Sequence, residues 1–190
     1  MRLLLLIACA ASLAAALPVH ADDEVAEGLP APGFQLRTLN PEAAKVSWVN
    51  LEHYVGAEPE DPQARAVVLS FFASWCGPCQ KELPYLQQLH QMYREQGLRV
   101  IAVDIDKDEA GIAQARKAIA ANGITYPVGS DRFNLLARRY LGDKSPLPSV
   151  FIIRKDGTVA KIAKGYSKDA SSFLLAEVQR VLGLGKGAAK

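Results

Sequence analysis

The chain has 190 residues, of which 49% are hydrophobic, and its 22 basic and 20 acidic side chains leave a net charge of +2. This length favours a single domain, and the hydrophobic content is enough for a real core. A charge so close to zero provides no basic footprint for nucleic acid and no polybasic patch for a membrane surface, so we expect neither partner.

Residues 1–21 have the features of a secretory signal peptide. Arg2 precedes an almost wholly apolar run from Leu3 to Leu17, and Val19-His20-Ala21 is an acceptable cleavage pattern. The run of about 15 residues is shorter than the ~20 that span a bilayer, although a retained anchor stays an alternative. Cys9 lies in a stretch that resembles a bacterial lipoprotein box, which makes lipidation a second alternative. We expect export to the periplasm or to the outer face of the cytoplasmic membrane, with residues 22–190 as the mature domain.

Two alternating stretches open the mature domain. Residues 34–39 and 45–51 alternate apolar and polar side chains, as half-buried strands do, and Asn40-Pro41 between them is a turn signal. They predict an N-terminal hairpin that neighbours the next strand, with Trp48 serving packing. Residues 56–65 contain two prolines and three acidic residues and predict a solvated loop.

A buried strand leads directly into two closely spaced cysteines. Residues 67–73 are almost all apolar and suit a central strand, and from Gly77 onward the apolar residues follow a helical spacing. Cys76 is therefore expected at or just before a helix N-terminus, where free N–H groups and the helix dipole stabilise a thiolate. Because the thiolate is the attacking species in thiol–disulfide exchange, we predict that Cys76 is the nucleophile and Cys79 the resolving thiol.

Other uses of paired cysteines are weaker alternatives. A structural zinc site needs roughly four ligands, and His53 and His90 fall at no finger-like spacing. Haem attachment requires a histidine where Gln80 stands. A purely structural disulfide and a copper-carrier site stay open. We expect no metal and no cofactor.

The remaining elements alternate between helix and strand. A helix should run from the cysteine pair to about Gln96, with a kink at Pro84, and Lys155-Asp156-Gly157 should join two antiparallel strands. The closing helix should turn Phe173, Leu174, Val178 and Val181 inward. The other expected elements are strand 99–105, helix 109–121 capped by 106–108, at most a short strand at 125–128, helix 132–141, strands 149–153 and 158–164, and helix 168–182. This order predicts an α/β fold with a central mixed β-sheet flanked by helices.

The motif Trp75-Cys76-Gly77-Pro78-Cys79, followed far downstream by Leu147-Pro148-Ser149, resembles the thioredoxin superfamily. It is most similar to the exported TlpA/ResA-like branch of thiol–disulfide oxidoreductases, over roughly residues 28–183. The resemblance implies a thioredoxin-like fold with the N-terminal hairpin and a central β-α insertion around residues 112–121. It also implies that Pro148 is the cis-proline facing the disulfide and that the Leu147 backbone meets an extended substrate, which we expect also to contact Trp75, Gly77 and Pro78. Further stretches that carry the likeness are 28–34, 79–84, 103–106 and 126–128.

The resemblance assigns Glu82 the role of the acid that tunes proton transfer at the cysteines. Cys79 and Glu82 are three residues apart and share a helix face, so a carboxylate there could act as the base for the second thiol or raise its pKa. The alternative is a solvated glutamate in the first helical turn. Cytosolic thioredoxins carry a buried aspartate where this chain has Ser70, which cannot titrate, so that role is absent or filled by Glu82.

These observations predict an exported thiol–disulfide oxidoreductase. The Gly77-Pro78 dipeptide is that of reducing thioredoxins and favours a reductase. By resemblance, a membrane thiol–disulfide carrier would donate electrons, and the substrates would be protein disulfides, apocytochrome c among them; we expect a monomer. The alternatives are a net oxidant or isomerase, a peroxide-reducing redoxin, and a binding module for copper or unfolded exported chains. Trp75 directly ahead of Cys76 argues against the redoxin.

Overall fold

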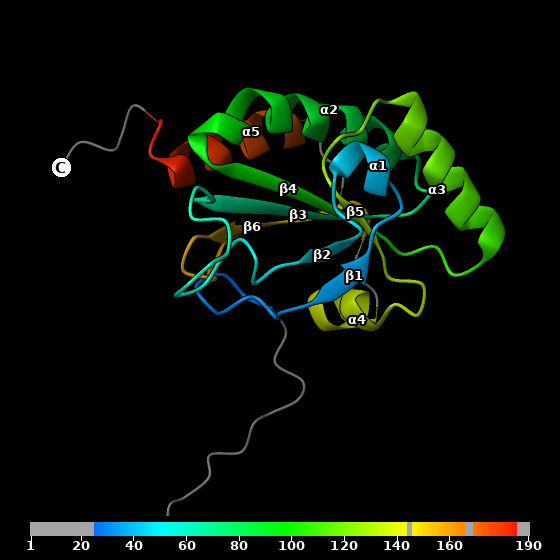
Figure 1. Ribbon diagram of the computed structural model, residues 1–190, viewed down its shortest axis with the longest axis horizontal. Coiled ribbons are helices and arrows are strands. Elements are labelled where there is room, and N and C mark those ends of the chain that lie inside the picture. The colour runs from blue at the N-terminus through cyan, green and yellow to red at the C-terminus, as the bar shows by residue number, and fades with distance from the viewer. Residues whose placement is uncertain (1–24, 144–145, 166–168, 186–190) are drawn as a thin grey trace, which may run out of the picture.

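A five-stranded mixed sheet forms the centre of the computed structural model, which describes residues 25–143, 146–165 and 169–185 (Figure 1). The strand order is β5-β4-β3-β6-β7, with β3 parallel to β4, β4 parallel to β5, and the other neighbours antiparallel. The predicted α/β fold with a central mixed sheet is confirmed. The strands are β3 (Ala66–Phe72), β4 (Leu98–Asp104), β5 (Val128–Ser130), β6 (Ser149–Arg154) and β7 (Val159–Lys164).

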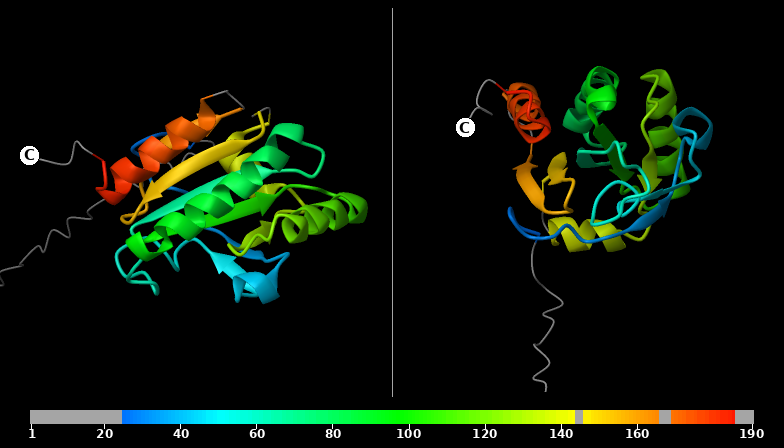
Figure 2. Two further views of the ribbon diagram at one scale, coloured as in Figure 1. Left: turned by 90° about the horizontal axis from the view of Figure 1, so that it is seen from above. Right: turned by 60° about the vertical axis from the view of Figure 1, so that its left-hand side comes forward.

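Helices cover both faces of this sheet. In Figure 2, α5 (Ala170–Leu182), α2 (Gly77–Tyr93) and α3 (Glu109–Ala121) lie side by side over one face, and α4 (Leu135–Leu141) lies against the other. Two separate hydrophobic clusters correspond to these two layers. All seven residues of β3 are buried, because alternate side chains enter the two clusters: Val68 and Phe72 point toward α2, and Leu69 and Phe71 toward α4.

The predicted N-terminal hairpin exists but lies elsewhere than expected. β1 (Gln35–Arg37) and β2 (Trp48–Asn50) pair antiparallel, with the short α1 (Pro41–Ala44) between them. The prediction that the hairpin neighbours β3 is wrong, because β4 and β6 occupy both edges of that strand. The hairpin continues instead onto β5, where the Leu39 N–H donates to the Val128 carbonyl at 2.7 Å and Thr38 bridges Gly129.

Two aromatic side chains expected in the core are on the surface. Trp48 is 56% exposed, because the alternation of β2 turns Val49 inward instead. Phe173 is 36% exposed, whereas Leu174 and Val178 of the same helix are buried as predicted. Both expectations of packing were therefore wrong.

Side-chain caps or glycines mark several of the helix ends. Asp108 caps α3 by accepting from the Gly111 N–H at 2.7 Å, and the 3₁₀ turn η1 (Arg94–Gln96) after α2 ends at Gly97 with φ of 96°. The strand expected at 125–128 lies at 128–130, and the helix expected from residue 132 begins at Leu135. That later start reflects Asp131, whose carboxylate accepts from the N–H groups of Leu135 and Ala137.

The leader is not part of the described structure. The predicted signal peptide 1–21 and Cys9 lie outside the described residues, as does residue 168 at the expected start of the last helix. Within the described ranges, no helix is both long enough and apolar enough to cross a membrane.

Candidate active site

The two cysteines lie where β3 passes into α2. Cys76 is the N-cap residue of α2, with φ of −84° and ψ of 100°, and its sulfur accepts from the Cys79 N–H at 3.2 Å. The two sulfurs form a disulfide with an S–S distance of 2.01 Å. The predicted position of Cys76 at a helix N-terminus is confirmed. When the disulfide is reduced, the N–H donor and the helix dipole favour a thiolate at Cys76.

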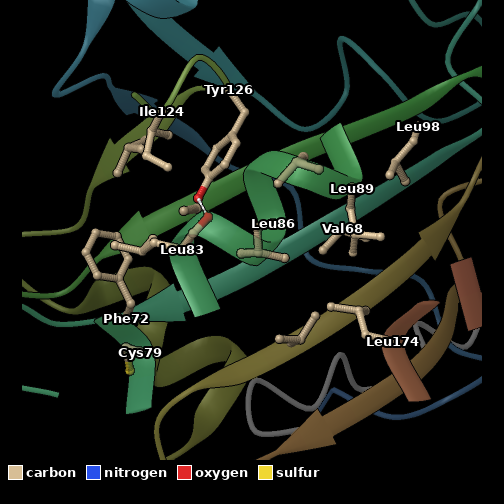
Figure 3. Close-up of a cluster of buried hydrophobic side chains, with 14 of the residues drawn as sticks. Val68, Phe72, Cys79, Leu83, Leu86, Leu89, Leu98, Ile124, Tyr126 and Leu174 are labelled. Carbon is tan, nitrogen blue, oxygen red and sulfur yellow. Dashed lines mark hydrogen bonds between the residues drawn. The ribbon is translucent and has the colours of Figure 1, made fainter. Parts of the chain in front are cut away.

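The two sulfurs differ in their access to solvent. Cys79 is fully buried at the end of the hydrophobic cluster under α2, near Phe72 and Leu83 (Figure 3). Cys76 is 6% exposed, but it lines an open surface groove of about 520 Å³. A partner that docks in the groove can therefore reach Cys76 and not Cys79.

The groove brings together residues that the sequence placed far apart. Trp75 lines it just before Cys76, Gly77 and Pro78 line it from the first turn of α2, and Leu147 lines it from the segment before β6. The Leu147–Pro148 peptide bond is cis, as expected. The side chain of Trp75 is 71% exposed at the rim.

Two further lining residues, Ile105 and Pro146, were not predicted. Ile105 follows directly after β4, which runs parallel to β3. Since parallel neighbours end at the same edge of a sheet, this position could have been found from the strand prediction. Pro146 lies two residues before the cis-proline Pro148.

Glu82 is not a solvated residue of the first helical turn. It lies on α2 one turn after Cys79, and the Ser70 hydroxyl on β3 donates to its Oε1 at 2.6 Å. Burial raises the pKa of Glu82 to about 7, while the hydrogen bond from Ser70 acts to lower it. At neutral pH the carboxyl group is divided between its two protonation states and can accept or release a proton.

A small cavity links Glu82 to the surface between α2 and α5. Its volume is about 80 Å³, and Lys81, Tyr85, Ser171 and Leu174 are among its lining residues. Glu82 therefore borders a second hollow, which shares no lining residue with the groove at Cys76.

A match to a known family agrees with this geometry. Residues 28–162 match the model of the AhpC/TSA family. The chain belongs to this family. It is 30% identical over 141 residues to the thiol-disulfide oxidoreductase ResA of Geobacillus kaustophilus (strain HTA426), covering 74% of this chain and 71% of the relative. It is 29% identical over 164 residues to ResA of Bacillus subtilis (strain 168), covering 86% and 82%.

Solved structures show the same architecture. A thiol:disulfide interchange protein DsbE from Chlorobium tepidum superimposes with a TM-score of 0.69 at 28% identity, covering 84% of this chain and all of the other. The thioredoxin-like fold and the ResA-like resemblance are confirmed, and the chain is a thiol–disulfide oxidoreductase.

Proposed function

We propose that the protein is an exported disulfide reductase that passes two electrons from the Cys76–Cys79 dithiol to disulfides of other exported proteins. One observation supports this above all: Cys76 caps α2 at an open groove bordered by Leu147, while Cys79 is buried behind it. An attacking sulfur must meet its substrate, and a resolving sulfur must be shielded from it.

The reaction proceeds in two exchanges. The Cys76 thiolate attacks one sulfur of the substrate disulfide, forms a mixed disulfide and releases the other substrate sulfur as a thiolate. Cys79 then loses its proton and attacks the Cys76 sulfur, which restores the Cys76–Cys79 disulfide and releases the second substrate thiolate. The substrate gains the two electrons that the dithiol loses. A dithiol carrier in the membrane returns the enzyme to its reduced form.

Glu82 takes the proton of Cys79 in the second exchange. The pKa of about 7 suits a group that accepts a proton and then passes it to solvent at neutral pH. The substrate segment lies extended across the groove, against the Leu147 backbone and the exposed Trp75 ring. We further propose that apocytochrome c is among the substrates and that the enzyme acts as a monomer.

Export rests on the leader sequence of residues 1–21. Fractionating the host cells and sequencing the N-terminus of the mature chain tests both the location and the cleavage. A start at Asp22 supports cleavage, whereas a chain that keeps Leu3 to Leu17 and stays with the membrane indicates a retained anchor.

The reductase proposal is tested by the redox potential of the Cys76–Cys79 pair and by reduction of insulin disulfides with dithiothreitol. A potential near −270 mV with catalysis above background supports a reductase, whereas a potential near −120 mV identifies an oxidant. No catalysis together with tight copper binding would favour a binding module. Peroxide consumption by Cys79→Ser would indicate a redoxin.

Trapping identifies the substrates. Cys79→Ser expressed in the native host should accumulate mixed disulfides through Cys76, because the second exchange is blocked. The double variant Cys76→Ser/Cys79→Ser is the matched control and should trap nothing.

A further inference from the structure

The segment that leads into Cys76 is held by its main chain. The Ser74 N–H donates to Asp106 Oδ2 at 2.7 Å, and the Ser74 carbonyl accepts from Gln80 Nε2 at 3.2 Å. Both polar main-chain groups of Ser74 are therefore bound by side chains, one from the loop between β4 and α3 and one from α2. Since Ser74 is two residues before Cys76, the position of the attacking sulfur depends on these contacts.

Helix α3 packs against Asp106 and fixes its side chain. Its side chain is 3% exposed, and Gly111 of α3 packs directly against it. A Cβ atom on Gly111 would lie 2.7 Å from Asp106 Oδ1 and 2.9 Å from Asp106 Cγ, so only glycine lets the helix approach this closely. Helix α3 therefore covers the carboxylate and keeps it aimed at Ser74.

A second carboxyl group lies next to Asp106 and is fully buried. Asp104 ends β4, its Oδ1 is 3.5 Å from the Asp106 N–H, and its Oδ2 has no hydrogen-bond partner among the described residues. Burial, and then the neighbouring carboxyl of Asp106, raise the pKa of Asp104 to about 8, against a weaker opposing effect of Arg116 on α3. Asp104 is thus mostly uncharged at neutral pH.

We propose that Asp106 is a positioning residue for the dithiol. Its carboxylate fixes Ser74, and with it the main chain of Trp75 and Cys76, on the β4–α3 loop, so that the attacking sulfur faces Leu147 across the groove. The bond needs an oxygen acceptor at this position, which an amide as well as a carboxylate can supply. The inference rests on the proposed role of Cys76 as the attacking thiolate.

The test compares Asp106→Ala with Asp106→Asn. Two quantities are measured: the rate constant for reaction of the reduced protein with insulin, and the mobility of the Trp75 ring by time-resolved fluorescence anisotropy. The anisotropy is recorded in a Trp48→Phe background, because the chain has two tryptophans. Asp106→Ala should lower the rate constant about tenfold and increase the mobility of Trp75. Asp106→Asn keeps an oxygen acceptor and should recover most of both.

Two further variants separate positioning from a general loss of stability. Ser74→Pro removes the donor instead of the acceptor and should give the same Trp75 mobility as Asp106→Ala. Asp61→Ala removes a carboxylate that pairs with Arg99 at 2.6 Å, near the end of the sheet opposite Cys76. This variant should lose stability and keep both the rate constant and the rigid Trp75.

Two results would overturn the proposal. One is an Asp106→Asn protein as slow as Asp106→Ala, which would show that charge and not the acceptor matters. The other is an Asp106→Ala protein with unchanged rate and unchanged Trp75 mobility. If the parent protein reduces no insulin, the proposed function fails, and the anisotropy of Trp75 still decides whether Asp106 holds the loop.

Discussion

At the scale of single residues, the hydrogen bond from Ser70 acts on the pKa of Glu82, the group that we propose takes the proton of Cys79. A carboxylate in this half-buried place is disfavoured by lost solvation, and the hydroxyl of Ser70 offsets part of that penalty by donating to the charged form. The two effects together place the pKa of Glu82 near 7. Without the Ser70 hydroxyl only the desolvation would remain, and it raises the pKa of Glu82.

Ser70→Ala should therefore raise the pKa of Glu82 above 7 and leave less carboxylate at neutral pH. The second exchange, in which Cys79 loses its proton, should slow at pH 7, and its pH profile should move to higher pH. Single-turnover release of reduced substrate from the mixed disulfide, followed across pH 5.5 to about 9, measures this.

Glu82→Gln provides the control for this assay, because it removes the titrating group and should flatten the same part of the profile. Ser70→Ala placed in that background should then have no further effect on the profile. If Ser70→Ala does not shift the pH profile although Glu82→Gln slows the second exchange, then the Ser70 hydroxyl does not tune the pKa of Glu82.

At the scale of elements, Gly129 of β5 has no side chain and so leaves room for the N-terminal hairpin to pack against this strand. A Cβ atom on Gly129 would lie 2.9 Å from Leu36 Cβ and 3.2 Å from Val49 Cγ1. Gly129→Ala should therefore push the hairpin outward and lower the free energy of unfolding by about 1–3 kcal/mol, as overpacked cores do. Urea unfolding of the oxidised protein measures the change.

Leu36→Ala relieves part of that clash. It removes Leu36 Cδ1, which a Cβ atom on Gly129 would also meet at 2.9 Å, and it keeps Leu36 Cβ. The double variant Leu36→Ala/Gly129→Ala should be more stable than the sum of the two single losses predicts. Strictly additive losses would show that the hairpin does not depend on this contact.

These elements also show which features of the fold the local sequence pattern predicts and which it does not. The change from an apolar strand to helical spacing located the start of α2 and hence Cys76, and Asp156-Gly157 located the turn between β6 and β7. Placement of the hairpin on β5 depends on a gap at Gly129, which alternation within the hairpin does not encode. The bond from Ser74 to Asp106 joins residues 32 positions apart, so no local period could indicate it.

At the scale of the whole molecule, three buried ionisable groups should govern how stability varies with pH. Burial raises the pKa of Asp104 to about 8 and that of Glu82 to about 7, and it lowers the pKa of His90 to about 4. Between the unfolded and folded pKa values of each acid, the folded chain holds a proton that the unfolded chain has lost, so stability falls as pH rises. His90 acts in the opposite direction up to its unfolded value of 6.5.

Above pH 6.5, then, only the two acids remain, and from pH 7 to 8 Asp104 contributes most of the change, because Glu82 has already lost about half of its proton at pH 7. The free energy of unfolding of the oxidised protein should fall by about 1.4 kcal/mol per pH unit in that last window. Asp104→Asn, which imitates the uncharged acid, should remove most of this slope. Urea unfolding at pH 6.5, 7, 7.5 and about 8 measures it.

The exposed turn residue Asp156, whose pKa is lowered by hydrogen bonds from Thr158, supplies the matched control, because Asp156→Asn affects only more acidic pH. An Asp104→Asn protein that keeps the parental slope would show that Asp104 does not cause it.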